Sequence, residues 1–197
     1  MLREAAAGCR GCDLYGPATQ TVFGEGDPHA RMMLVGEKPG DQEDKEGHPF
    51  VGPAGRELDR ALESAGVEPR HVYVTNVVKH FKFVQRGKRR IHQKPTAGEV
   101  KACTPWLDHE IEMVRPEVMV LLGATAAQAI VGRAFRITRQ RGELLAVDGR
   151  PAVIATWHPS AILRANEHED RARMREELAG DLEAAARFAP GRRRRAG

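Results

Sequence analysis

Four short apolar runs alternate along the chain with longer segments in which apolar residues recur at helical spacing. The runs are residues 31–37 (RMMLVGE), 72–78 (VYVTNVV), 118–122 (VMVLL) and 152–157 (AVIATW). Short, continuous apolar runs are typical of parallel strands that are buried on both faces. Because strands that alternate with helices form parallel sheets, the pattern predicts an α/β fold: a three-layer α/β/α sandwich around a central four-stranded parallel sheet.

The segments between these runs contain signals for helix ends. Pro53 suits the first position of a helix that Gly66 can close. Residues 96–99 (TAGE) fit a capping box before a second helix, which must end before Pro116. The remaining predicted elements are a short helix (124–131), a hairpin-like stretch with an Asp148-Gly149 turn (136–149) and a final amphipathic helix (about 167–187).

Polar residues follow three of the predicted strands directly. Residues 37–41 come after the first strand, Asn76 lies near the end of the second, and His158 comes just after the fourth. In a parallel α/β sheet the ligand crevice lies outside the carboxyl ends of the strands. We therefore expect these three segments to meet in one binding site.

The segment 76–95 (NVVKHFKFVQRGKRRIHQKP) is strongly basic, and no Asp or Glu lies between Asn76 and Gly98. We interpret it as a long loop with uncompensated positive charge. A run of like charges is often only a solvated surface. Here Phe81 and Phe83 are interleaved with the cations, which favours phosphate and nucleic-acid binding. The cations are Lys79, Lys82, Arg86, Lys88, Arg89, Arg90 and Lys94.

The net charge indicates a localised positive surface. The 197-residue chain has a formal net charge of +4, and the four arginines at 192–195 account for all of it. The rest of the chain therefore sums to zero, and its positive charge is concentrated in the basic loop. Length and composition predict one domain over residues 1–189, followed by a disordered basic tail at 190–197.

Three cysteines cannot form a paired disulfide framework, which favours a reducing cytoplasm. The first residues lack the apolar core of a signal peptide, and no apolar run approaches the roughly 18 residues of a membrane span. We expect a monomer with no membrane partner. Cys9 and Cys12 form a Cys-x-x-Cys pair, which on its own fits a redox dithiol, half of a metal site or chance.

Several segments, taken in order, resemble the uracil-DNA glycosylase superfamily. They are GEKPGDQED (36–44), PFVGPAGR (49–56), VYVTNVVKH (72–80), GKRRIH (87–92) and HPSAILR (158–164). The resemblance covers about residues 9–187 and is strongest to the iron-sulfur family-four branch. Within that branch, the chain resembles the UdgX group, which becomes covalently attached to uracil-containing DNA. It implies a uracil-DNA glycosylase-like DNA-repair domain that acts on uracil-containing DNA, single-stranded and also double-stranded.

The resemblance also implies a metal centre. In the family a 4Fe-4S cluster is held at the positions of Cys9, Cys12, His80 and Cys103, with histidine at position 80 as in the UdgX group. Three thiolates and one imidazole suit an iron-sulfur cluster, and they suit tetrahedral zinc as the alternative. The expected role is structural, because the centre would tie the N-terminus to the start of the basic loop.

For the base, the resemblance implies that Phe50 stacks on uracil and that Asn76 reads its edge, with Gly36 and Lys38 as further uracil-binding residues. The Asn amide oxygen can accept from uracil N3–H while its amino group donates to O4, and cytosine presents the opposite pattern. Taken singly, Phe50 also fits a core position and Asn76 a turn cap. Lys38 departs from the family, which has alanine there in family four and glutamine in UdgX-like chains; this cation could lower the pKa of Glu37 or contact phosphate.

Four residues carry the implied chemistry. His158 would stabilise the departing uracil oxygen, and Asp41 would face the sugar cation or position a water. His92 would attack C1′ of the sugar as a neutral imidazole, oriented or deprotonated by Glu37. The resulting bond lacks a good leaving group, so the protein would stay attached. As an isolated residue, His92 also fits a phosphate-contacting histidine.

The implied DNA contacts lie in three segments. Backbone donors at the helix start near Gly52 suit phosphate, and apolar residues of the 160–164 stretch would fill the vacated base stack. The expected DNA-binding residues are Gly52, Arg56, Lys88, Arg89, Arg90, Ser160 and Arg164.

The sequence therefore predicts an enzyme that excises uracil from DNA and bonds His92 to C1′ of the abasic sugar in a single turnover. One alternative is an ordinary family-four glycosylase that turns over. Another is a non-enzymatic iron-sulfur protein that binds uracil-containing DNA. A nucleotide-binding α/β protein is disfavoured, because neither a GxGxxG nor a P-loop lysine motif occurs.

Overall fold

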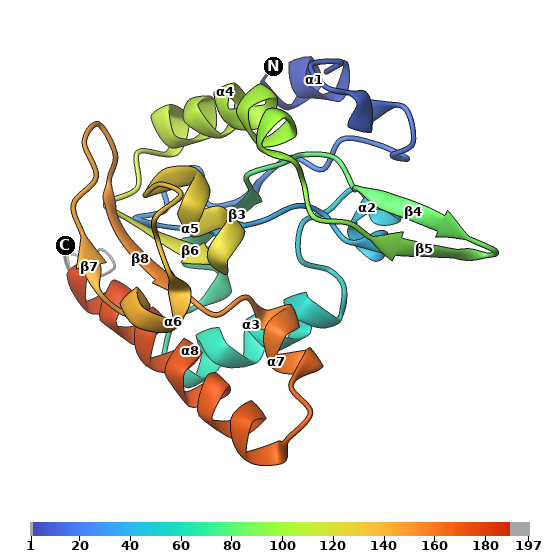
Figure 1. The fold of residues 1–197 in the computed structure, drawn as a ribbon. Coiled ribbons are helices and arrows are strands. Elements are labelled where there is room, and N and C mark those ends of the chain that lie inside the picture. The colour runs from blue at the N-terminus through green and yellow to red at the C-terminus, as the bar shows by residue number, and fades with distance from the viewer. Residues whose placement is uncertain (1, 190–197) are drawn as a thin grey trace.

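The computed structural model describes residues 2–189, and its main feature is a mixed sheet of six strands in the order β1-β3-β2-β6-β8-β7 (Figure 1). The four central strands are parallel, as the apolar runs predict. They are β3 (Val72–Asn76), β2 (Met32–Gly36), β6 (Val118–Leu122) and β8 (Ala152–Thr156). The register places Gly36 level with Asn76 at the carboxyl ends of β2 and β3.

Two short edge strands extend the predicted four-stranded sheet to six. β1 (Glu25–Gly26) and β7 (Leu144–Leu145) run antiparallel to their neighbours. The predicted Asp148-Gly149 turn lies between β7 and β8, and Gly149 takes the left-handed conformation at φ 68°. The hairpin that we expected within residues 136–149 is therefore formed by β7 and β8, and the stretch 136–149 also contains a short helix.

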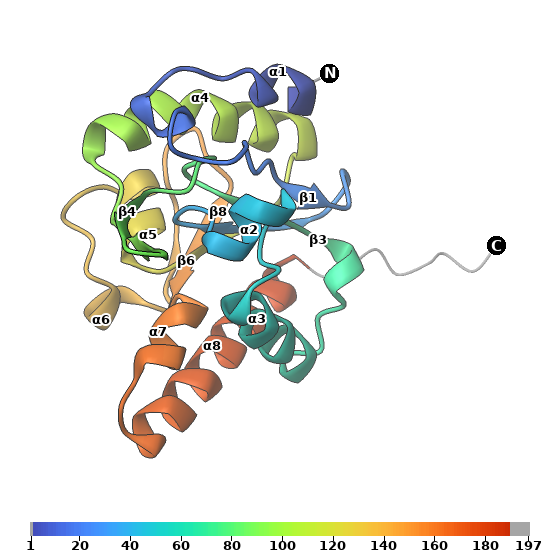
Figure 2. The same cartoon turned by 90° about the vertical axis from the view of Figure 1, so that its right-hand side faces the viewer.

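Helices cover both faces of the sheet, which gives the expected three layers (Figures 1 and 2). Successive residues of a strand point to opposite faces. Met33 and Met119 pack in the core cluster on the side of α4, whereas Leu34 and Val120 pack on the side of α8. The helices are α1 (Leu2–Ala7), α2 (Asp41–Glu46), α3 (Pro53–Ser64), α4 (Ala97–Val114), α5 (Ala124–Ile130), α6 (Ile137–Gln140), α7 (Pro159–Arg164) and α8 (His168–Phe188).

The helix-end signals in the sequence are confirmed at two places. Thr96 and Glu99 form the capping box of α4, with Glu99 N–H donating to Thr96 Oγ1 over 3.2 Å. Pro53 begins α3. Four of the α-helices were not predicted: α1 precedes the Cys-x-x-Cys pair, α2 follows Gly40, α6 lies in the stretch that we expected to be hairpin-like, and α7 follows His158.

The basic segment is a β-hairpin and not an open loop. β4 (Phe83–Arg86) pairs antiparallel with β5 (Arg89–His92), and Phe83 lies opposite His92. The hairpin projects from the body of the protein (Figure 1). It therefore carries His92 on its returning strand, next to the carboxyl ends of the central strands.

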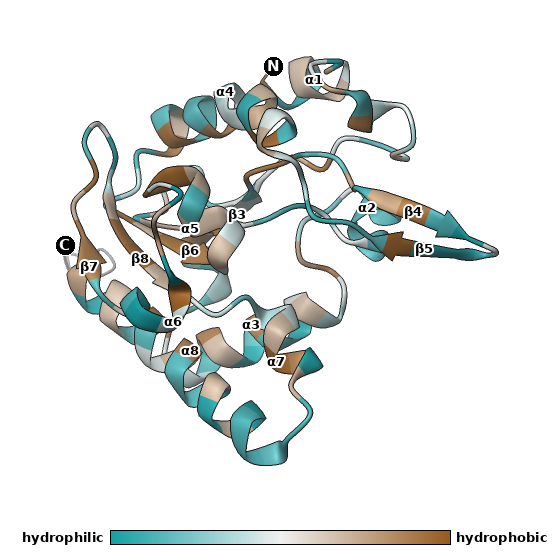
Figure 3. Cartoon of the chain, viewed as in Figure 1, coloured by the Kyte–Doolittle hydropathy of each residue, from teal (hydrophilic) through white to brown (hydrophobic). Residues whose placement is uncertain are grey.

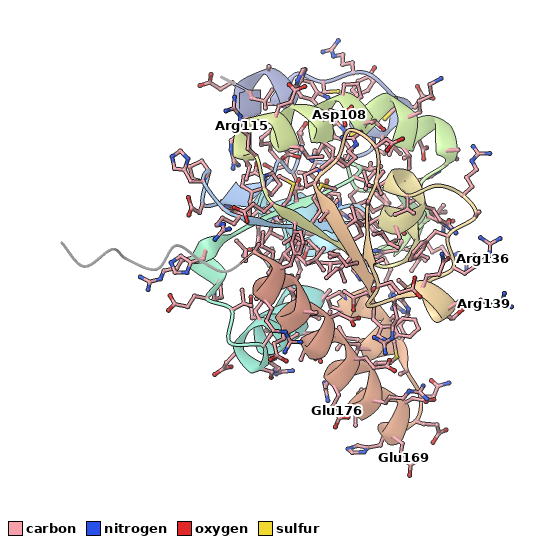
Figure 4. All side chains as sticks on the ribbon, turned by 90° about the vertical axis from the view of Figure 1, so that its left-hand side faces the viewer. Asp108, Arg115, Arg136, Arg139, Glu169 and Glu176 are labelled. Carbon is pink, nitrogen blue, oxygen red and sulfur yellow. The ribbon has the colours of Figure 1, made fainter. Side chains whose placement is uncertain are left out.

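In the hydropathy colouring, apolar residues are visible on β6, β7 and β8 of the sheet, and hydrophilic residues recur along α4 and α8 (Figure 3). Charged side chains such as Arg136, Arg139, Glu169 and Glu176 point outward at the periphery (Figure 4). No helix within residues 2–189 combines the length and the apolar character needed to cross a bilayer. The tail predicted at 190–197 lies outside the described residues.

Candidate active site

The three predicted segments meet in one cavity of about 870 Å³ at the carboxyl ends of the central strands. The segment after β2, the end of β3, the hairpin and the start of α7 all line it. Most of the predicted catalytic, base-binding and DNA-binding residues lie here together. They are Glu37, Lys38, Asp41, Phe50, Asn76, Arg89, Arg90, His92, His158, Ser160 and Arg164.

Asn76 presents an unpaired polar atom in this cavity. The residue is 2% exposed, and its side-chain Oδ1 is buried without a hydrogen-bond partner. A buried acceptor without a partner is costly unless a ligand satisfies it. Gly36 makes room beside it, because a Cβ at position 36 would collide with Asn76 Oδ1 and lie 2.7 Å from Phe50 Cζ. The arrangement suits a flat ligand that donates a hydrogen bond from its edge.

Phe50 is held in an unusual backbone conformation beside Asn76. Its φ is 56°, the left-handed region that residues with a Cβ seldom adopt. Gly55 permits this, since a Cβ there would collide with the Phe50 carbonyl. The Phe50 ring stacks against His158, with ring centroids 6.1 Å apart. The fold thus fixes an aromatic surface inside the cavity.

His158 is a neutral hydrogen-bond donor in this environment. Its Nδ1 accepts from the Ser160 backbone N–H over 3.1 Å, so the neutral ring carries its proton on Nε2. Burial lowers the pKa of His158 to about 4, and the nearby Arg164, Lys38 and His92 act in the same direction. Gly123 allows the close approach, because a Cβ there would lie 2.8 Å from His158 Cβ.

Lys38, not Glu37, makes the direct contact with His92. Lys38 Nζ lies 3.3 Å from His92 Nδ1 and 4.0 Å from Glu37 Oε1. Within residues 2–189, no hydrogen bond joins Glu37 to His92, so the expected direct orientation of the imidazole by Glu37 is not seen. Burial lowers the pKa of His92, and the charge of Lys38 lowers it further. The His92 ring also packs edge-on against Phe81, with centroids 4.8 Å apart.

Arg90 anchors the hairpin to α2. Its Nε donates to Asp41 Oδ1 over 2.5 Å and its Nη1 to Asp44 Oδ2 over 2.6 Å. The guanidinium also lies 5.2 Å from the Phe81 ring centroid and 5.0 Å from that of Phe83. Hydrogen bonds from Lys45 and Arg90 keep the pKa of Asp41 below its usual range. Asp41 is therefore ionised and committed to these cations.

Glu43 is a site-shaping residue that the sequence reasoning missed. Its side chain accepts from Gly40 N–H over 3.0 Å and from Gly52 N–H over 2.8 Å. The carboxylate thereby ties together the two turns that flank the cavity. The spacing of Gly40 and Glu43, which is that of a capping box, could have revealed it. The Gly52 N–H thus already has an acceptor within the protein, and the prediction that Gly52 contacts DNA stays a prediction.

The expectation that the seven cations of the basic segment 76–95 lack partners is wrong. Lys79 pairs with Glu110, Lys82 with Glu99, and Arg90 with Asp41 and Asp44, all partners outside the segment. Phe81 is fully buried and serves as core. The exposed cations of the segment are Arg86, Lys88, Arg89 and Lys94, and Arg56 is likewise exposed on α3.

The predicted metal ligands lie in one region without forming a closed site. Within residues 2–189, no three His, Cys, Asp or Glu side chains converge closely enough to hold a metal ion. Burial raises the pKa of the Cys103 thiol to about 11, and Cys9 and Cys12 are near enough to add to this rise. His80 Nε2 lies 2.9 Å from Thr21 Oγ1.

Two N–H groups nevertheless point at the cysteine sulfurs. Lys79 N–H donates to Cys103 Sγ over 3.2 Å, and Trp106 Nε1–H donates to Cys9 Sγ over 3.1 Å. Hydrogen bonds of this kind stabilise metal-bound thiolates and tune iron-sulfur clusters. The chemistry of these residues therefore fits a thiolate-bound metal centre.

The α/β/α sandwich thus presents an aromatic surface, an unpaired amide and a neutral histidine at its strand ends, an arrangement that suits a flat ligand with a hydrogen-bond donor on its edge. The chain belongs to the uracil-DNA glycosylase superfamily, whose family model matches residues 23–183. It is 38% identical over 189 residues to a type-4 uracil-DNA glycosylase of Thermotoga maritima, covering 95% of this chain and 93% of that protein. A type-4 uracil-DNA glycosylase of Archaeoglobus fulgidus is 37% identical, covering 92% of this chain and 88% of its own length. Similarity extends to a type-5 uracil-DNA glycosylase of Pyrobaculum aerophilum, 34% identical over 70% of this chain and 64% of that protein.

Proposed function

We propose that this protein removes uracil from DNA by hydrolysing the N-glycosidic bond and then turns over. The observation that carries the proposal is the buried, unpaired Oδ1 of Asn76 beside the fixed Phe50 ring. Uracil supplies an N3–H donor for this acceptor and a flat face for the ring. The family membership and the names of the type-4 relatives support the same activity.

The base would enter the cavity after leaving the base stack, which costs a few kcal/mol in a duplex. Stacking on Phe50 offsets about 1–3 kcal/mol of this cost. The Asn76 oxygen accepts from uracil N3–H and its amino group donates to O4. Cytosine lacks the N3–H and presents a donor where O4 would be, so it leaves the buried Asn76 unpaired and is rejected.

Bond cleavage places negative charge on uracil and positive charge on the sugar. The N1–C1′ bond breaks, and its electron pair leaves with the uracil ring. His158, neutral and protonated on Nε2, donates to the uracil oxygen on which the charge develops. A water oxygen then adds to C1′, and its excess proton passes to solvent water. The ionised Asp41 lies in the cavity wall, and because it is paired with Lys45 and Arg90 it would act on the sugar cation only through longer-range electrostatic attraction.

DNA would reach this cavity along the exposed cations of the site. Lys88 and Arg89 lie at the hairpin tip, and Arg164 lies at the end of α7 with its Nη1 donating to Ser160 Oγ. Phosphates approach such exposed cations without the loss of an internal ion pair. Arg90 is bonded to Asp41 and Asp44, so a phosphate would have to compete with two carboxylates for this guanidinium.

Cys9, Cys12, Cys103 and His80 would hold a 4Fe-4S cluster, with zinc as the alternative metal. The N–H groups that point at Cys9 and Cys103 support this assignment. When bound, the cluster would act as a structural cross-link between the N-terminal segment and α4. Iron and sulfide analysis of the purified protein, with its visible absorption, distinguishes the cluster from stoichiometric zinc.

The test is uracil release from a single-stranded oligonucleotide with the substrate in excess. More than one uracil should be released per protein molecule, and cytosine or thymine in the same position should not be released. Asn76→Leu should lose the activity while it keeps the fold. No uracil release by the folded, metal-loaded protein would refute the proposal and leave a uracil-DNA-binding role.

A second candidate function is covalent capture of the sugar by His92. It is supported by the position of His92 in the cavity wall and by its lowered pKa, which keeps the imidazole neutral. Against it, one of the two ring nitrogens is already in contact with a side chain, because Lys38 Nζ lies 3.3 Å from His92 Nδ1. The names of the type-4 relatives also favour turnover. An SDS-resistant adduct with uracil-containing DNA that disappears in His92→Ala would select capture.

A further inference from the structure

Lys38 is a buried amine in the wall of the cavity. It follows β2 directly, and its side chain is 6% exposed. The cavity that it lines also contains Asn76, Phe50 and His158, which are the groups that hold and release the base. The amine therefore lies in the cavity where the sugar is left after uracil departs.

The amine has little to keep it protonated. Its one ion pair in the part of the chain described by the structure is with Glu37, at 4.0 Å, which is longer than a hydrogen bond. Its other polar contact there is His92 Nδ1, at 3.3 Å, and the Phe81 ring lies 5.4 Å away. Burial lowers the pKa of Lys38 and Arg164 acts in the same direction, while Glu37 and Glu43 oppose the shift.

A partly desolvated lysine amine is the group that forms imines with carbonyl substrates. Abasic DNA carries such a carbonyl, because its C1′ is an aldehyde when the sugar ring is open. We propose that Lys38 forms an imine with C1′ of abasic DNA and that the chain thereby cleaves the strand on the 3′ side of the lesion. This inference rests on the proposed function for the origin of the abasic site.

The steps balance without an oxidant or a reductant. Neutral Nζ adds to C1′, the aldehyde oxygen leaves as water, and a protonated imine forms. The imine withdraws electrons from C2′, whose proton passes to a base; the neutral His92 imidazole, in contact with Nζ, lies on that side. The C2′–H electron pair forms a C1′–C2′ double bond, and the resulting enamine expels the 3′ phosphate. Water then hydrolyses the imine and restores the Lys38 amine.

The experiment uses abasic oligonucleotide prepared beforehand by acid treatment, so uracil excision is not needed. The metal-loaded protein is mixed with it in the presence and absence of sodium cyanoborohydride, which reduces an imine to a stable secondary amine. We expect a reductant-dependent, SDS-resistant adduct, and peptide mass spectrometry should place it on Lys38. Without the reductant, the labelled strand should be cut at the lesion.

Two substitutions separate the amine from its charge. Lys38→Arg keeps the positive charge but cannot form an imine, and Lys38→Gln removes both. Trapping and strand cleavage should fall by about tenfold or more in both variants, because the nucleophile is lost in each. Lys101→Gln, which changes an exposed lysine on α4, should keep both activities and so controls for reaction at surface amines.

Trapping in Lys38→Arg at the level of the unaltered protein would overturn the inference, as would an adduct on any other amine or no reductant-dependent adduct at all. Uracil release from uracil-containing DNA is measured on the same preparations. A chain that releases uracil but forms no imine loses only this inference. A chain that traps abasic DNA but releases no uracil loses only the proposed function.

Discussion

Two lysines are buried just beyond the carboxyl ends of neighbouring strands, Lys38 after β2 and Lys79 after β3, and their surroundings differ sharply. Lys79 is 0% exposed and belongs to an ion-pair region between β3 and α4, where Nζ bonds Thr75 Oγ1 and the Asn76 carbonyl at 2.7 Å and Glu110 Oε2 at 2.5 Å. Lys38 belongs to the cavity region and has no carboxylate within hydrogen-bond distance among the described residues. Asn76 joins the two regions, with its carbonyl facing Lys79 and its amide in the cavity.

The difference shows how one residue type serves two purposes. A buried charge that is paired and fully hydrogen-bonded holds its surroundings in one arrangement, and removal of one partner is costly. A buried cation with weak pairing shifts its pKa and becomes available for chemistry. The ion-pair region thus supports the backbone at Asn76, and the cavity region uses the side chains that this backbone presents.

The largest expected effect is in the ion-pair region. Lys79→Met leaves the Glu110 carboxylate buried without its cation, so the free energy of unfolding should fall by about 3–5 kcal/mol. Urea unfolding monitored by circular dichroism measures it. The double variant Lys79→Met with Glu110→Leu should recover most of the loss, because no charge then remains buried. A loss below about 1 kcal/mol in Lys79→Met would show that the pair is not structural.

A comparable effect on activity, without loss of stability, is expected at Asn76. Asn76→Leu removes the group that we propose reads uracil, and kcat/KM for uracil release should fall by about 10²–10³-fold. The unfolding free energy should change little, since the Asn76 Oδ1 has no partner to lose. Measured together, urea unfolding and uracil release test the division between the regions. If Asn76→Leu lowers the free energy of unfolding as strongly as it lowers the transition-state stabilisation measured by kcat/KM, the division between the two regions is contradicted.

A smaller effect concerns the acid side of the stability profile. The folded pKa of His158 is about 4 against an ordinary value of about 6.5, so between these values the unfolded chain binds more protons. Stability from this residue is complete above pH 6.5 and is lost as the pH falls toward 4, by about 3 kcal/mol. His158→Gln should flatten the profile in this window, whereas His71→Gln, at an exposed site, should not. An unchanged profile in His158→Gln would mean that the ring is not held neutral.

The smallest effect distinguishes free from internally paired cations. Lys88 is exposed at the hairpin tip, whereas Lys82 pairs with Glu99 at 2.9 Å. Lys88→Ala should reduce the slope of log K against log salt for DNA binding by about one unit, because one phosphate contact is lost. Lys82→Ala should change the slope much less. Equal slope changes would indicate that both lysines contact phosphate.

Local patterns in the sequence were sufficient for the frame of the molecule. The four central strands and the capping box at Thr96 depend on residues close together in the chain, and the parallel pairing follows from the alternation of strands with helices; all are confirmed. The convergence of residues 37–41, Asn76 and His158 follows from a general property of parallel sheets. Phe50 was placed by resemblance and not by pattern.

The missing parts depend on contacts between distant residues. Lys79 was counted as a free cation because its partner Glu110 lies 31 residues away. The same is true of Arg90, whose carboxylates lie 46 to 49 residues before it. A charge count along one segment cannot reveal partners that come from another segment. For this reason we interpreted the basic segment as an open loop and did not predict that it is a hairpin anchored to the rest of the protein.

The left-handed backbone at Phe50 constrains how this site can evolve. Position 50 keeps its ring in the cavity only while position 55 carries no Cβ, since even a methyl group there would meet the Phe50 carbonyl. The two positions must therefore vary together, although residue 55 has no role in the chemistry. A descendant that acquires a different base preference has to alter the wall around Phe50 and leave Gly55 as it is.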